Sequence, residues 1–129
     1  MNIPSEAEFD TLLQQWMTDY GHLCFNVTQR PENGVYVGKG SIYENPYRVK
    51  GKHAPEIRKK NIIGFYIHLK KALLTNTTDL TRESVLALRG RPLVCFCNDG
   101  SNIPDPEKYC HSMVLAAAAE ALWKQCNQT

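Results

Sequence analysis

The sequence PLVCFC at residues 92–97 decides the fold, because it is a nearly continuous run of apolar, strand-forming residues. A strand with one solvent-exposed face alternates apolar and polar residues, whereas an unbroken apolar run is typical of a strand covered on both faces. This run is therefore predicted to be the central strand of a sheet. Side chains alternate along a strand, so Cys95 and Cys97 are expected on one face and Phe96 on the other.

Segments with helical or strand periodicity lie on both sides of this run. Ser5 and Glu8 form a capping box before the first apolar helix. Helices are predicted over residues 5–19, 56–74, 82–88 and 110–124, and two further strands over residues 23–28 and 35–38. The order helix, strand, strand, helix, helix, strand, helix predicts a small α/β protein, with helices on both faces of a partly parallel sheet.

Composition limits the protein to one domain and to few function classes. A chain of 129 residues with 43% hydrophobic content builds one core, so residues 1–129 are expected to form a single domain. The net charge of +2 permits nucleic-acid binding without requiring it. The first ten residues lack the features of a signal peptide, and no apolar run approaches the ~18 residues of a membrane span. We therefore expect a cytoplasmic protein without a membrane partner.

The five cysteines are expected as thiols, thiolates or metal ligands, because disulfides are rare in a reducing compartment. Cys24 and Cys126 are expected to pack or to be exposed without chemistry. The other three cysteines gather around one turn, where the loop 98–109 joins the central strand to the last helix, which Cys110 and His111 begin. Ligands of open α/β sheets usually bind at such carboxyl ends of strands.

This turn has four interpretations. Cys95, Cys97, Cys110 and His111 match a Cys₃His zinc site in number, although their spacing is atypical. Cys110 at a helix start beside His111 is chemically plausible as a nucleophile with its acid or base. The cysteines could also simply pack in the core. The fourth interpretation, which we favour, is a ligand pocket lined by these groups, with Cys110 and His111 as the candidate catalytic residues.

The loop after the second strand has the features of an anion cradle. In VYVGKGS, a strand ends and two glycines let the backbone approach a ligand, while a lysine adds charge and a serine a hydroxyl. An exposed glycine turn explains the same residues without a ligand. Aromatic side chains further along could stack on a base or merely fix the loop. The candidate ligand-binding residues are Gly38, Lys39, Gly40, Ser41, Tyr43, Asn45, Tyr47, Arg48 and His53.

Together, VYVGKGSIYENPY, FYIHL, LRGRPLVCFC and CHSMVLAAAAEAL resemble a family of small phage and bacterial proteins known as domain of unknown function 4326. The resemblance covers residues 22–124 and leaves the N-terminal helix, residues 1–20, outside it. The residues that match the family pattern are Gly38, Ser41, Asn45, Pro46, Cys95, Cys97, Cys110 and His111. Its departures from the pattern are Lys39, Glu44, Tyr47 and the pair Ser112 and Met113. The resemblance implies a Rossmann-like layered fold and a phage or prophage setting, which would place the protein in the host cytoplasm.

These observations favour a protein that binds a nucleotide or nucleotide-derived ligand between loop 38–55 and turn 95–111. Processing of the bound ligand is an extension of this hypothesis. The cofactor is left open, and so is whether the protein is an enzyme. A non-catalytic sequestering protein, often an oligomer, would use the same pocket. A zinc-stapled interaction module is a third hypothesis. A protein or nucleic-acid binder acting through the basic run 58–60 is the fourth.

Overall fold

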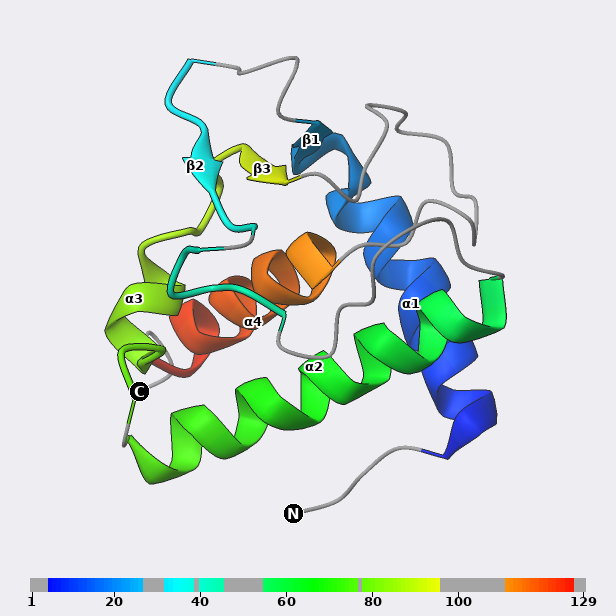
Figure 1. Ribbon diagram of the computed structural model, residues 1–129. Coiled ribbons are helices and arrows are strands. Elements are labelled where there is room, and N and C mark those ends of the chain that lie inside the picture. Colours follow the sequence, from blue (N-terminus) through cyan, green and yellow to red (C-terminus); the bar gives the residue numbers. More distant parts are fainter. Residues whose placement is uncertain are drawn as a thin grey trace.

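A computed structural model describes residues 5–26, 32–38, 40–45, 55–76, 78–95 and 111–126 (Figure 1). The side chains of Glu6, Asn26, Cys95 and residues 55–58 fall outside this description. The helices are α1 (Glu6–Tyr20), α2 (Pro55–Thr75), α3 (Arg82–Leu86) and α4 (His111–Cys126), and the strands are β1 (Cys24–Asn26), β2 (Val35–Tyr36) and β3 (Leu93–Cys95). The predicted order of elements is confirmed.

The three strands form a parallel sheet in the order β1-β3-β2. Leu93 of β3 pairs with Cys24 on one side and with Val35 on the other. The prediction that the PLVCFC run supplies the central strand is therefore confirmed. The ladder continues one residue beyond β2, because the Val37 amide donates to the Val94 carbonyl at 2.8 Å.

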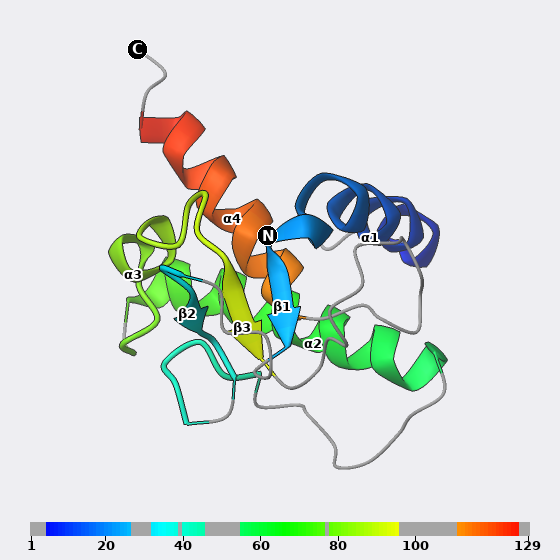
Figure 2. The same cartoon turned by 90° about the horizontal axis from the view of Figure 1, so that it is seen from above.

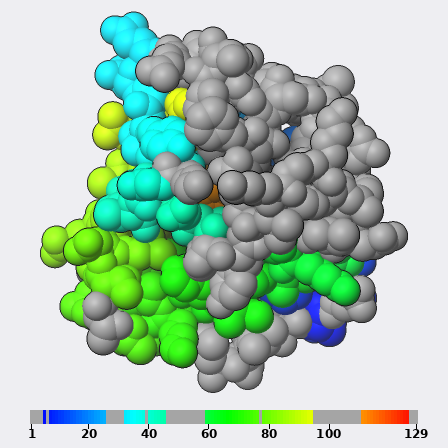
Figure 3. All heavy atoms as spheres, in the orientation of Figure 1, coloured from blue at the N-terminus to red at the C-terminus, as the bar shows by residue number. Residues whose placement is uncertain are grey.

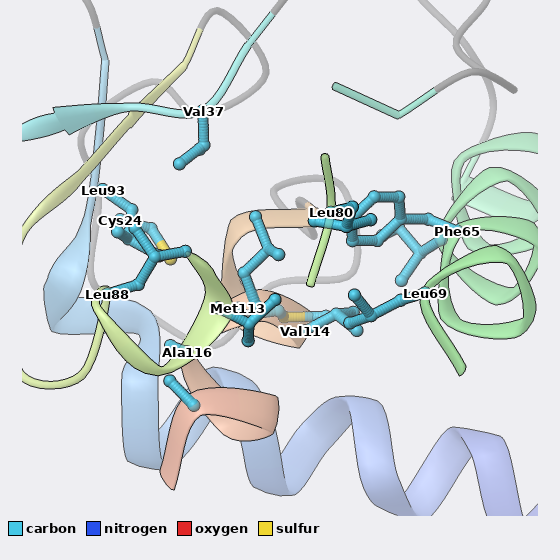
Figure 4. Packing of buried hydrophobic residues seen from close by; sticks show 14 of the residues in the cluster. Cys24, Val37, Phe65, Leu69, Leu80, Leu88, Leu93, Met113, Val114 and Ala116 are labelled. Atoms are coloured by element: carbon cyan, nitrogen blue, oxygen red, sulfur yellow. The ribbon is translucent and has the colours of Figure 1, made fainter. Parts of the chain in front are cut away.

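One face of this sheet packs on α4. Cys24, Val37 and Leu93 point from the strands toward Met113 and Val114 of the helix (Figure 4), and all five are at most 2% exposed. In Figure 1 the strands lie above α4 and α2, and seen from above α3 lies beside β2 and α1 beside β1 (Figure 2). The protein is thus a mixed α/β fold, in which the described part of the chain supplies helices to one face of the sheet.

Two capping boxes set the starts of helices, and the one at Ser5 was predicted from the sequence. The Ser5 side chain accepts from the Glu8 amide, and the Glu8 side chain accepts from the Ser5 amide. Thr81 and Ser84 form the same reciprocal pair before α3. Each box satisfies amides that a helix start would otherwise leave without partners. None of the described helices is both long and apolar enough to cross a membrane.

Candidate functional site

The candidate site begins where β2 ends, because the start of α4 meets the chain there. Nε2 of His111 lies 2.7 Å from the carbonyl oxygen of Val37, and His111 is 2% exposed. A carbonyl oxygen only accepts, so Nε2 carries the proton of this bond. The glycine-containing loop and the first residue of the last helix, which are 74 residues apart in this contact, are therefore neighbours at the carboxyl edge of the sheet.

Besides the Val37 carbonyl, the His111 ring contacts an aromatic side chain. The ring meets Phe65 of α2 edge-on, with 5.0 Å between the ring centroids. Because Nε2 already donates to Val37, proton transfer to a ligand by His111 would have to use Nδ1. The imidazole accordingly has a structural role, holding α4 against β2, besides the catalytic role that the sequence predicts for it.

Gly38 and Ser41 close a tight turn immediately after β2. The Ser41 amide donates to the Gly38 carbonyl at 3.1 Å, and the Ser41 hydroxyl donates to the same oxygen at 2.7 Å. The hydroxyl oxygen in turn accepts from the Tyr43 amide at 3.3 Å. Gly40 lies inside this turn with a backbone φ of 90°, a conformation that residues other than glycine rarely adopt. The single hydroxyl proton of Ser41 is used within the turn, so in this arrangement Ser41 shapes the loop.

Two further side chains tie the same loop to helices. The Tyr43 hydroxyl donates to the Ser84 carbonyl of α3 at 2.8 Å, and Asn45 Nδ2 donates to the Asn61 carbonyl of α2 at 3.2 Å. Burial raises the pKa of Tyr43, while the positive charge of Arg91 acts in the opposite direction. In Figure 3 the surface of residues 32–45, in cyan to teal, borders the surfaces of α3 and α2. The described residues of segment 37–45 are thus attached to α4, α3 and α2 through side-chain hydrogen bonds.

The remaining candidates lie outside the described residues. They are Lys39, Tyr47, Arg48, His53, Cys97, Cys110 and the side chain of Cys95. The zinc and nucleophile interpretations of the cysteine turn therefore stay predictions. Among the side chains that the structure does describe, no three His, Cys, Asp or Glu residues come together in a way that could hold a metal ion. Cys24 is buried and Cys126 is exposed, as expected for cysteines without a ligand.

One residue at the site was not predicted. Tyr36 is 39% exposed, and a Cβ atom added to Gly38 would lie 2.8 Å from the Tyr36 hydroxyl oxygen. The signal for this contact is the spacing Tyr-x-Gly within a strand, because residues two apart share a face. The partners of Tyr43 and Asn45 carried no such signal, since both are backbone carbonyls.

The family model described as "Domain of unknown function (DUF4326)" matches residues 25–121. The chain belongs to this family. Four of the residues that match the family pattern lie in the described part of the site and hold segment 37–45 in place, namely Gly38, Ser41, Asn45 and His111. Searches of curated proteins and of solved structures found no match to the chain.

Proposed function

We propose that this DUF4326 protein binds a nucleotide or nucleotide-derived ligand at the carboxyl edge of its sheet. The observation that carries the proposal is the hydrogen bond from His111 to Val37, which sets the start of a 16-residue helix against a glycine turn. Amides in the first turn of a helix have no partner within the helix, and the helix dipole is positive there. A phosphate group is the ligand that such a helix start and a glycine turn favour together.

The proposal divides the site into a frame and a set of contacts. Gly38, Ser41, Asn45 and His111 supply the frame, because their hydrogen bonds and backbone shape position the loop. Charge and stacking come from the other candidates, which are Lys39, Tyr47, Arg48 and His53. Cys110 would then lie beside His111, nearest to any chemistry on the ligand. The Rossmann-like layering, the phage setting and the cytoplasmic location belong to the same proposal.

The proposal is tested first by native mass spectrometry of the protein purified without chelator. A mass excess equal to a nucleotide would support it and identify the ligand. Calorimetric titration with AMP, GMP, CMP and UMP follows, with Lys39→Ala expected to weaken binding while the fold stays intact. Lys71→Ala, which removes an exposed lysine from α2, is the matched control and should leave affinity unchanged. Absence of both a bound nucleotide and any titratable binding would overturn the proposal.

The same experiments separate the other hypotheses. A nucleotide that is bound and released intact indicates a sequestering protein. A mass excess equal to zinc that disappears in Cys97→Ser indicates the zinc-stapled module. Association with a macromolecule that weakens steeply with salt, and that does not change in Cys110→Ala, indicates a binder acting through the basic run 58–60.

A further inference from the structure

We infer that Tyr36 is the platform on which the base of the bound nucleotide stacks. The inference rests on the proposed function and extends it to the part of the ligand that the protein recognises. It begins from the alternation of side chains in β2. Val37 is fully buried on the helix-covered face of the sheet, so Tyr36 points to the opposite face, where it is 39% exposed. Tyr36 pairs there with Val94 of the central strand.

The Tyr36 ring leans along the strand onto Gly38. A Cβ atom at Gly38 would lie 2.8 Å from Oη and 2.9 Å from both Cε1 and Cζ of Tyr36. These three adjacent atoms are the hydroxyl oxygen and the two ring carbons beside it, so this position lies against the hydroxyl end of the ring. The ring therefore occupies the space that a side chain at residue 38 would need, and the glycine permits this approach.

This position brings an aromatic ring to the start of the candidate phosphate-binding turn. Gly38, which the hydroxyl end of the ring contacts, is also the first residue of the turn that Ser41 closes. A phosphate at the turn would consequently place its sugar and base within reach of Tyr36. Tyr43 is less suited to stacking, because its side chain is half-buried. Tyr36 is exposed, its ring rests against Gly38, and it lies at the carboxyl edge of the sheet, next to the turn.

The chemistry of stacking defines the ligand class. Every base has a π face, so an aromatic platform discriminates weakly among bases and favours the larger purines. The inference therefore names a mononucleotide, or a derivative that keeps the base, as the ligand. A purine should bind more tightly than a pyrimidine, and either should bind more tightly than ribose 5-phosphate, which has no base.

The test compares AMP with ribose 5-phosphate by calorimetric titration of the full chain. Wild-type protein is expected to prefer AMP, and Tyr36→Leu should reduce AMP affinity about 10- to 100-fold while leaving ribose 5-phosphate affinity unchanged. Tyr36→Phe keeps the ring and should retain the preference. Trp123→Leu, which removes an aromatic side chain of similar exposure from α4, is the control and should also retain it. Circular dichroism and thermal melting confirm that each variant is folded.

Two results would overturn the inference without touching the proposed function. One is equal affinity of the wild-type protein for AMP and ribose 5-phosphate. The other is a preference for AMP that survives in Tyr36→Leu, since the base would then stack elsewhere. If the protein binds none of AMP, GMP, CMP, UMP and ribose 5-phosphate, the proposed function fails and the inference fails with it.

Discussion

The imidazole of His111 donates a 2.7 Å hydrogen bond to the carbonyl oxygen of Val37, and the amide of Val37 donates a 2.8 Å bond to the carbonyl of Val94. Both backbone polar groups of Val37 are therefore satisfied, although the residue is completely buried. Its amide joins the chain to β3 and its carbonyl joins it to α4. Val37 is thus the point at which the central strand, the glycine loop and the last helix are held together.

His111→Ala should lower the free energy of unfolding by about 2–4 kcal/mol. The substitution leaves the buried Val37 carbonyl without its donor and creates a space beside Phe65. Urea denaturation followed by circular dichroism measures the change. His22→Ala, at an exposed position, is the control and should shift stability by less than about 0.5 kcal/mol. A stable His111→Ala protein would show that the ring does not hold α4 to β2 and would leave only the catalytic hypothesis.

Tyr43→Phe should cost about 1 kcal/mol, which is the ordinary net contribution of one hydrogen bond. The phenol bonds the Ser84 carbonyl at 2.8 Å, and without it the loop loses its attachment to α3. Hydrogen exchange of the amides of residues 41–45 should accelerate in the variant, because the loop opens at a lower free-energy cost. Unchanged exchange and unchanged stability would show that Asn45, bonded to α2, suffices to hold the loop.

The scaffold could be predicted from local sequence signals. An unbroken apolar run marked β3 as central, and the capping box of Ser5 and Glu8 marked the start of α1, because these features depend on residues close together in the chain. The frame of the site could not be predicted in this way. Asn45 and His111 bond backbone carbonyls 16 and 74 residues away, and a carbonyl has no residue type that a sequence pattern could reveal.

The same limit explains how His111 was interpreted. A histidine that follows a cysteine at a helix start has the residue types of a catalytic pair, so the sequence favours chemistry. Only the fold shows that one ring nitrogen is already bonded to Val37. Tyr36 was overlooked for the opposite reason, since a tyrosine inside a short strand is typical of ordinary sheet packing.

Gly38→Ala should destabilise the wild-type protein by about 1–3 kcal/mol, because the new methyl group would press on the Tyr36 ring. In a Tyr36→Ala background the same change should be close to neutral, since the ring that it meets is absent. A double-mutant cycle measured by urea denaturation gives the coupling between the two positions. Equal costs in both backgrounds would mean that the cost of the methyl group does not come from contact with Tyr36.

Cys24 should make the protein lose stability as the pH rises from 9 to about 11. Burial raises the pKa of this thiol from 9.0 to about 11, and the neighbouring Ser112 hydroxyl only partly offsets the effect. Below pH 9 the thiol is protonated in both states, so its contribution to stability is complete. Between the two pKa values only the unfolded chain releases the proton, and stability falls by about 1.4 kcal/mol per pH unit.

Cys24→Ala isolates this contribution from that of Tyr20 and Tyr43, whose pKa values are also raised by burial. At pH 7 the variant should be about 1 kcal/mol less stable than the wild-type protein, because it loses a buried sulfur atom. The wild-type protein alone then loses the thiol contribution at high pH. Urea denaturation under reducing conditions should therefore show the two stability curves converging above pH 9 and crossing before pH 11. Curves that stay parallel would show that the Cys24 thiolate is as well solvated in the folded protein as in the unfolded chain.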